Sequence, residues 1–460
     1  AGYSVSNFNL STDTVPNSKR WPARLAWVVI LALTAFVAYR NARVDRTPGN
    51  NEITMDDIRI RMLGEELIGL KALGTLAGPT QSSQLAQNQE RLFLQMDEFA
   101  RSPKDKLHVA IIAGEVLGGP RALMRLEGLS GSSTSSELAA DVAALHTIYS
   151  SSAAALDPTM QDLLIRRHDY FAHVALAYGL NANAGPRIEI ESSARRAMIA
   201  LGFAGLVFAL LFVGAAGFFI TAIVLWVKGR LRTVYVPNRS ANTAFLEGFA
   251  IYFVLFILGF GLLRRFFTLT SLQWEWIAWL IIPAVLFWIG RRGITAEERR
   301  LALGWHTGKG VLREIGAGLA GYLAGIVVMA AGFTVTYFLI KHSGVSPEHP
   351  LIHILKGDRW HVLGLYALVS VFAPVIEETM FRGALFHHMR RRWGWAVSAP
   401  VVAFIFAIIH PQGWAAVPVL GSIALVLAAL REWRGSLIAP MVAHAFNNFL
   451  ALTLALALLR

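Results

Sequence analysis

Long apolar runs dominate the chain, and their lengths predict membrane-spanning helices. The run ALGFAGLVFALLFVGAAGFFITAIVLWV at 200–227 contains no charged residue. About 20 residues at 1.5 Å per residue cross the hydrocarbon core of a bilayer, so such a run is a transmembrane candidate. We therefore expect an all-α, polytopic membrane protein with about nine transmembrane helices, at 25–39, 198–227, 243–263, 276–290, 315–340, 361–383, 395–410, 415–430 and 437–459.

Residues 46–195 follow a different pattern, with apolar residues recurring every three or four positions between charged ones. This spacing is typical of amphipathic helices. It predicts helices in MDDIRIRMLGEELIGLKALG, SSQLAQNQERLFLQMDEFAR, ELAADVAALHTIYSSSAAAL and MQDLLIRRHDYFAHVALAYGL. We expect a soluble helical domain inserted between the first two spans, and the division 1–45 (tail and first anchor), 46–195 (inserted domain), 196–310 (spans two to four with a basic loop) and 311–460 (last spans).

The first apolar run admits two interpretations, a cleavable signal peptide or a retained anchor. We favour the anchor, because no small-x-small cleavage site follows the run within a few residues. The composition agrees with a membrane protein, since 55% of the residues are hydrophobic and 16% are charged. Cysteine is absent, which excludes disulfides, thiolate metal sites and a cysteine nucleophile.

The net charge of +12 is distributed unevenly along the chain. Residues 46–195 hold 18 of the 30 acidic residues but 14 of the 42 basic ones. The basic excess lies instead at the ends of the apolar runs, which is typical of cytoplasmic loops and argues against a nucleic-acid partner. The basic loops 228–242, 291–314 and 387–395 can all face the cytoplasm at once. We then expect a cytoplasmic N-terminus, an extracytoplasmic domain at 46–195 and an outward C-terminus, although the basic pair at 264–265 opposes this orientation.

Ionisable residues inside the last four spans carry the candidate chemistry, because each costs about 2.5 to 3.5 kcal/mol in a bilayer. Glu378 and Arg382 are four residues apart, so they share one helix face and can form an ion pair. The same spacing relates Phe406 to His410 and His444 to Asn448, whereas Glu377 points elsewhere. One shared polar cavity would keep all of these residues away from lipid: Glu377, Glu378, Arg382, His410, His444, Asn447 and Asn448.

The motifs EETMFRG, FAIIH and HAFNN occur in this order, each on a predicted span. Together they resemble the three motifs of the CPBP family, which groups type II CAAX prenyl endopeptidases with ABI-type bacterial membrane proteins. The similarity covers residues 360–455 and says nothing of the inserted domain. It implies intramembrane peptide-bond hydrolysis in a catalytic core at 311–460. Glu377 and His410 would activate water, His444 and Asn448 would stabilise the oxyanion, and Glu378 with Arg382 would orient the site.

Metal dependence is left open by the sequence. One glutamate and two histidines, here Glu377, His410 and His444, would suit Zn²⁺ with a free position for water. Members of the family have been described both as metalloproteases and as metal-independent glutamate proteases, and this chain contains no H-E-x-x-H motif. We lean towards a metal-assisted enzyme and expect the same residues to act in either case.

Two other functions remain possible from the residues alone. The fold could serve as a non-catalytic membrane scaffold or immunity-type protein, or the buried Glu and His residues could form an ion path in a transporter. For the peptidase we expect a membrane-associated protein or peptide substrate, a bacterial inner-membrane location and a possible partner of the domain at 46–195. Outside the motifs, we interpret His387 and His388 as part of a solvated loop and His168 and His173 as surface residues.

Overall fold

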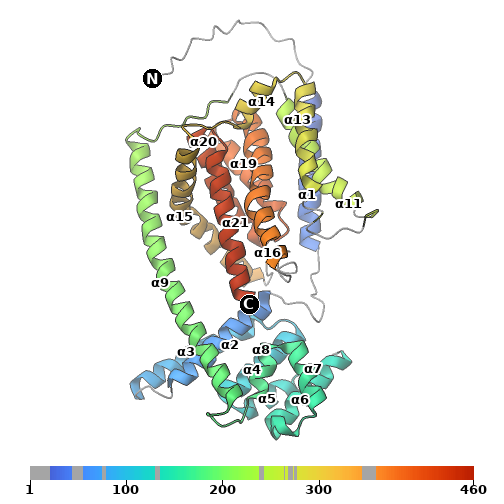
Figure 1. Cartoon of the computed structure of the whole chain (residues 1–460), viewed down its shortest axis with the longest axis vertical. Helices are drawn as coiled ribbons and strands as arrows, with labels where there is room; N and C mark the ends of the chain where they lie inside the picture. Colours follow the sequence, from blue (N-terminus) through green and yellow to red (C-terminus); the bar gives the residue numbers. More distant parts are fainter. Residues whose placement is uncertain are drawn as a thin grey trace. The chain divides into compact units, whose positions relative to one another are not determined.

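The computed structural model describes residues 21–43, 55–74, 79–129, 135–237, 243–263, 265–267, 273, 277–343 and 359–459. These residues form helices and connecting turns and contain no β-strand. The chain divides into two compact units (Figure 1). The membrane unit comprises 1–44, 214–347 and 354–454, and the inserted unit comprises 45–213, 348–353 and 455–460. Helix α9 (Gly185–Val227) begins in the inserted unit and ends in the membrane unit.

The inserted unit is a bundle of short helices with its own apolar core. Its helices are α2 (Met55–Gly74), α3 (Pro79–Phe99), α4 (Pro103–Leu117), α5 (Gly119–Glu127), α6 (Ser136–Ser150), η1 (Ala153–Ala155), α7 (Pro158–His168), α8 (Tyr170–Leu176) and the first part of α9. Helices α2, α3 and α6 agree with three of the predicted amphipathic segments, and the fourth segment divides into α7 and α8. Helix α4 was missed, because it is buried along most of its length and so lacks a polar face that would reveal a period.

A chain of buried polar side chains joins four helices of the inserted unit. The Nδ1 atom of His108 lies 3.2 Å from Asp57, and its Nε2 atom lies 3.0 Å from His168 Nδ1. The other nitrogen of His168 lies 3.2 Å from Asp141. The prediction that His168 is a surface residue is therefore wrong. Asp169 has φ of +44° and separates α7 from α8, so the helical spacing assumed for this segment does not hold.

The membrane unit contains the remaining helices. They are α1 (Trp21–Arg43), α10 (Ala244–Phe253), η2 (Val254–Gly259), α11 (Phe260–Leu263), η3 (Ala278–Leu280), α13 (Ile281–Arg291), α14 (Ala296–Leu303), α15 (Val311–Ser343), α16 (Arg359–Ala367), η5 (Leu368–Phe372), α17 (Ala373–Glu378), η6 (Thr379–Leu385), α18 (Phe386–Arg390), α19 (Trp395–Ile408), η7 (Trp414–Ala416), α20 (Val417–Arg434) and α21 (Ile438–Leu459).

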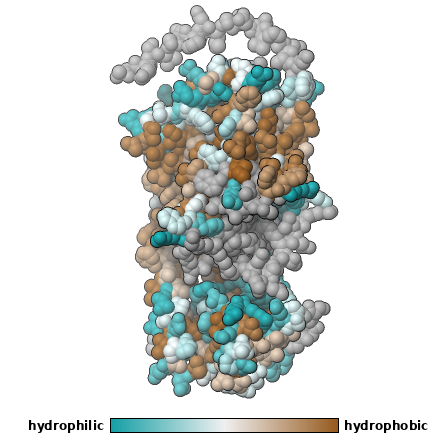
Figure 2. Space-filling model, turned by 45° about the vertical axis from the view of Figure 1, so that its right-hand side comes forward, coloured by the Kyte–Doolittle hydropathy of each residue, from teal (hydrophilic) through white to brown (hydrophobic). Residues whose placement is uncertain are grey.

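Seven helical stretches in the described part of the chain are long and apolar enough to cross a membrane. They are Trp21–Ala42, Gly185–Val227, Ala244–Leu263, Val311–Ser343, Arg359–Arg390, Trp414–Arg434 and Ile438–Leu456. The other two predicted spans are apolar helices of shorter length, Ile281–Arg291 and Trp395–Ile408. The prediction of a polytopic helical membrane protein is confirmed. Hydrophobic residues cover much of the membrane unit, the upper part of the view in Figure 2, with hydrophilic residues at its upper end.

Glycines along α15 allow close packing against its neighbour α20 and against Ala439 and Val442 of α21. Gly318, Gly325 and Gly332 recur every seven residues and so lie on nearly one face. A methyl group at Gly318 would lie 2.6 Å from the carbonyl oxygen of Ala439, and one at Gly325 would lie 2.5 Å from Val426. Small residues of this kind let membrane helices approach each other, since packing replaces the hydrophobic effect as the driving force in lipid.

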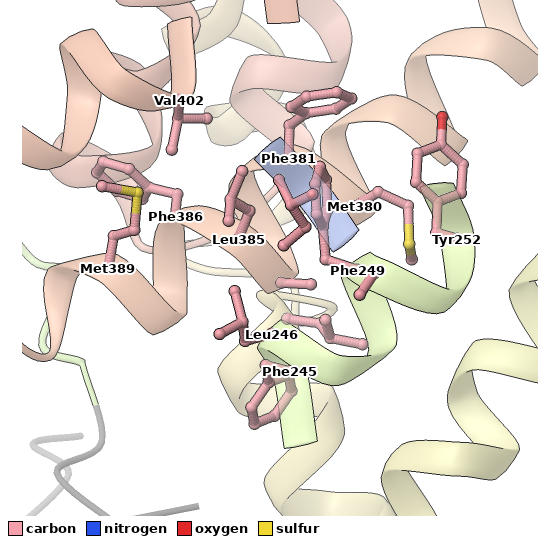
Figure 3. Close-up of a cluster of buried hydrophobic side chains, with 14 of the residues drawn as sticks. Phe245, Leu246, Phe249, Tyr252, Met380, Phe381, Leu385, Phe386, Met389 and Val402 are labelled. Carbon is pink, nitrogen blue, oxygen red and sulfur yellow. The ribbon is translucent and has the colours of Figure 1, made fainter. Parts of the chain in front are cut away.

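An aromatic-rich cluster holds α10 against η6 and α18 (Figure 3). Phe249 packs edge-to-face on Phe381, with ring centroids 5.1 Å apart. The same packing buries both histidines of α18, and His387 Nδ1 hydrogen-bonds the Tyr235 hydroxyl at 2.7 Å. The interpretation of His387 and His388 as a solvated loop is therefore wrong. The neighbouring arginines suggested a loop, but the helix continues to Arg390 and its apolar partners cover the two rings.

Candidate functional site

The span carrying the first motif alternates between α-helical and π-helical turns. Segment η5 precedes Pro374, and segment η6 follows Glu378. A proline inside an α-helix removes a hydrogen bond and collides with the preceding turn. The wider π-helical turn accommodates Pro374, and such turns occur often at functional sites. The two glutamates are the last residues of α17, directly between the two π-helical segments.

Glu378 is the centre of a buried ionic cluster. Its Oε1 atom accepts hydrogen bonds from Arg382 Nη1 at 2.8 Å and from His444 Nδ1 at 2.9 Å. Glu378 and Arg382 are both 0% exposed. The predicted ion pair is thus confirmed, and it extends to a second helix through His444 on α21. Arg382 Nη2 also donates to the carbonyl oxygen of Ala424 on α20, at 3.0 Å, a contact that has no signal in the sequence.

Phe406 on α19 packs against side chains from η6, from α21 and from the turn that follows α19. The Arg382 guanidinium lies 4.8 Å from the centre of its ring. The ring centroids of His410 and His444 lie 4.4 Å and 5.9 Å away. A cation above an aromatic face is attracted by the ring quadrupole, most strongly where water is excluded. Phe406 is therefore an apolar side chain that Arg382, His410 and His444 all contact. The F-x-x-x-H spacing thus brings His410 to the same aromatic ring as the other two residues.

The orientation of the His410 ring is fixed by the helix that precedes it. Its Nδ1 atom lies 2.5 Å from the carbonyl oxygen of Phe406. A carbonyl oxygen can only accept a hydrogen bond, so Nδ1 carries the proton and the neutral ring has a lone pair on Nε2. The backbone carbonyl of His410 accepts from the Asn41 side chain at 2.9 Å. Sequence reasoning missed Asn41, although an amide near the end of an apolar run was a usable signal.

Asn448 lies one helical turn after His444 on α21, as predicted from their spacing. Its Nδ2 atom donates to the carbonyl oxygen of Val369 in η5 at 3.0 Å. Its Oδ1 atom accepts from Asn447, whose own Oδ1 accepts from the Tyr322 hydroxyl on α15. Asn448 is therefore anchored to the span that carries the two glutamates. One of the two N–H groups of its side-chain amide makes the hydrogen bond to Val369.

Glu377 differs from its neighbour in exposure and in contacts. Its side chain is 25% exposed, and the nearest charged group is His444 Nε2, 3.7 Å from Oε2. That distance is too long for a hydrogen bond. Within the described residues, Oε2 is buried and has no hydrogen-bond partner. The structure thus brings Glu377, Glu378, Arg382 and His444 together, while Phe406 connects His410 to the same cluster.

The predicted metal ligands do not form a recognisable metal site. No group of three or more His, Asp or Glu residues in the described part of the chain could hold a metal ion, and Glu377, His410 and His444 are all described. Zinc prefers four ligands in tetrahedral geometry, three of them from the protein in a catalytic site. Since these side chains do not fit that arrangement, zinc stays a prediction and no step below depends on a metal.

The part of the chain that carries these residues is similar to a known family. Residues 359–450 match the family model of the type II CAAX prenyl endopeptidase Rce1-like proteins. The last spans contain an Rce1-like domain. This match confirms the resemblance to the CPBP family that the three motifs indicated. It covers η5, α17 and η6 together with α19, α20 and most of α21, and so includes every predicted site residue.

One curated relative is similar over part of the chain. An uncharacterized 24.3 kDa protein of Escherichia coli is 26% identical over 129 residues, which cover 26% of this chain and 59% of that protein. The chain therefore spans less than two thirds of the length of this relative. No solved structure matches the chain. The family match at 359–450 lies outside the inserted unit.

Proposed function

We propose that the protein is an intramembrane endopeptidase that hydrolyses a peptide bond of a membrane-associated protein or peptide. The contrast between the two adjacent glutamates carries this proposal. Glu378 is fully buried and its Oε1 atom binds Arg382 and His444, whereas Glu377 is partly exposed beside them and makes no hydrogen bond in the described residues. An ion pair with a purely structural role would not need a second, unpaired carboxylate beside it, because removing that charge from water costs free energy. The family of the Rce1-like domain supports the same chemistry.

Glu377 and His410 would activate the attacking water. A carboxylate in a poorly hydrated site suits general-base catalysis, because solvation no longer stabilises its charged form. The Phe406 carbonyl holds the His410 proton on Nδ1, so the Nε2 lone pair can accept a hydrogen bond from the same water. Glu377 removes a proton from this water while its oxygen attacks the carbonyl carbon of the scissile bond.

His444 and Asn448 would stabilise the oxyanion of the tetrahedral intermediate. Since His444 Nδ1 donates to Glu378, a second donation from Nε2 requires the doubly protonated ring. The carboxylates of Glu378 and Glu377 stabilise that positive charge. The second N–H of Asn448 completes the pair of donors, and preorganised donors of this kind contribute several kcal/mol to catalysis.

Collapse of the intermediate would complete the reaction. The carbonyl of the new carboxyl end forms again, the C–N bond breaks, and the proton held by Glu377 passes to the leaving amine. Arg382 does not touch the substrate in this scheme. It fixes Glu378, which in turn orients the ring of His444, as a positioning group does around many catalytic histidines.

We also propose the membrane placement predicted from the basic loops, with the N-terminus in the cytoplasm of a bacterial cell and the inserted unit outside. The inserted unit would then meet substrates or a partner at the outer surface. Labelling of single introduced cysteines tests this directly, because the chain contains no cysteine to label in the background. Labelling of an exposed inserted-unit site by an impermeant reagent in intact cells is expected. Protection of that site until the membrane is opened would contradict the orientation.

The peptidase is tested with purified protein in nanodiscs and two fluorogenic probes, a farnesylated CAAX peptide and an unmodified transmembrane peptide. Wild-type protein is expected to cleave at least one probe, and Glu377→Ala and His410→Ala should each abolish cleavage while leaving the protein folded. Comparison of membrane peptides from cells with wild-type protein and with Glu377→Ala would then identify the natural substrate. Cleavage that survives both substitutions would refute the assigned site, and wild-type protein that cleaves neither probe would favour the non-catalytic scaffold.

A further inference from the structure

His410 lies where a membrane helix ends before its backbone groups are satisfied. Helix α19 ends at Ile408, and Pro411 prevents the helix from continuing, because a proline disfavours helical geometry in the residue before it. The last four C=O groups of an α-helix receive no hydrogen bond from an N–H group of the same helix. In a bilayer such a carbonyl needs a protein donor, since water is scarce there.

The donor comes from the first membrane helix, far away in sequence. Asn41 near the end of α1 donates its side-chain N–H to the His410 carbonyl oxygen at 2.9 Å. Within the same residue, the ring is held by the Phe406 carbonyl and rests against the Phe406 ring. Two contacts therefore fix His410, one at the ring and one at the backbone, and only the second comes from another helix.

Helix α1 is firmly packed at this place. It contacts α19, α10 and the η7 turn that follows His410. Ala26 and Ile30 of α1 belong to the same buried cluster as Ala399 and Val402 of α19. At the other end of α19, the rings of Trp27 and Trp393 lie 6.4 Å apart. The position of Asn41 against His410 is thus held by a packed helix pair, and α1 lies outside the residues matched by the family model.

We propose that Asn41 is a positioning residue of the candidate active site, so that α1 completes a site whose other members all lie within 359–450. Asn41 does not touch the substrate. It fixes the His410 backbone and, through it, the direction of the Nε2 lone pair towards the water that Glu377 activates. This inference rests on the proposed peptidase function. It makes the first anchor a part of the enzyme in addition to a membrane tether.

The first experiment compares cleavage of the two fluorogenic probes by Asn41→Ala, Asn41→Asp and a control, Thr34→Val. Thr34 lies buried on the same helix and donates to its own helix at Ile30, so its replacement tests packing of α1 alone. Misplacement of a catalytic group by about 1 Å can cost about 100-fold in rate. We expect a loss of kcat of about 10- to 100-fold in both Asn41 variants, an unchanged KM, and normal kinetics in Thr34→Val.

The pH profile separates positioning from a general loss of structure. At neutral pH the carboxylate of Asn41→Asp has no proton to donate, but its protonated form can donate as the amide does. Cleavage by Asn41→Asp should therefore recover towards the wild-type rate as the pH falls, whereas Asn41→Ala should show no recovery. Equal rates in wild-type protein and both Asn41 variants, or a loss in Thr34→Val of the same size, would overturn the proposal.

The second experiment needs no activity and so separates this inference from the proposed function. Protein labelled with ¹⁵N-histidine gives ring signals, and the signal lost in His410→Gln identifies His410. We expect this signal to move in Asn41→Ala and to stay in place in Thr34→Val. An unmoved signal refutes the positioning role even if no probe is cleaved. If the signal moves but the protein cleaves neither probe, the result would support the positioning of His410 by Asn41 and count against the peptidase function.

Discussion

Substitution of the two adjacent glutamates should separate stability from catalysis. Glu378→Gln keeps the shape of the side chain but removes the charge that neutralises Arg382, which is 0% exposed. Removing one partner of a buried pair costs about 3 to 5 kcal/mol. The lower end of about 3 kcal/mol applies here, because the amide oxygen can still accept from Arg382 and the Ala424 carbonyl still accepts from Nη2.

Glu377→Gln should behave differently in the same assay. Its side chain is 25% exposed, makes no hydrogen bond in the described residues, and lies 3.7 Å from the nearest charged atom. The cost is therefore expected to be about 1 kcal/mol or less, as for weakly coupled pairs. Cleavage should nevertheless be lost, because the amide cannot take a proton from water.

Intrinsic fluorescence of the 13 tryptophans during heating measures the difference, and thiol-reactive dyes are excluded because the chain lacks cysteine. At about 2 to 4 °C per kcal/mol, the unfolding midpoint should fall by about 6 to 12 °C in Glu378→Gln and by about 4 °C or less in Glu377→Gln. Equal shifts in the two variants, or a larger shift in Glu377→Gln, would refute the assignment of Glu378 to structure and of Glu377 to catalysis.

Two further predictions concern the fold. Gly318→Ala should destabilise the membrane unit by about 1 to 3 kcal/mol, because its methyl group meets a backbone carbonyl at 2.6 Å. Gly316→Ala on the same helix, with nothing within 4 Å, should be neutral or stabilising, and equal unfolding midpoints would contradict the packing argument. In the inserted unit, burial lowers the pKa of His108 from 6.5 to about 4, so the folded state binds fewer protons than the unfolded state between these values. Stability should fall by about 3 kcal/mol as the pH drops from 6.5 to 4, and proteolysis that shows no such loss, or the same loss in His108→Gln, would refute this cause.

Local spacing was sufficient wherever a contact lies within one helix. The Glu378–Arg382 ion pair and the ring contact between Phe406 and His410 both join residues four positions apart, and the structure contains both. The membrane spans were equally accessible, because bilayer thickness sets the number of apolar residues needed. The resemblance to the family, which the match over 359–450 confirms, could be read from three short motifs because each depends on local spacing.

Interpretations of side-chain exposure that depended on neighbouring residues in the sequence were wrong where tertiary packing buries the side chain. His387 and His388 adjoin three arginines, yet packing buries both rings, and Phe245 of α10 lies against His387. His168 lies in a charged segment, yet its ring is buried at the end of α7 between His108 and Asp141. In both cases the local composition was polar, but the direction of the side chain depended on where the helix ends and on what packs against it.

The sequence by itself therefore determined that this is a helical membrane protein with an Rce1-like domain, and which polar residues need partners inside the bilayer. Only the tertiary structure decided who those partners are. His444 reaches Glu378 across 66 residues, and Asn41 reaches His410 across 369. Neither distance leaves a periodic signal, because contacts between helices depend on crossing geometry, which small residues such as Gly318 set through packing and not through spacing along the chain.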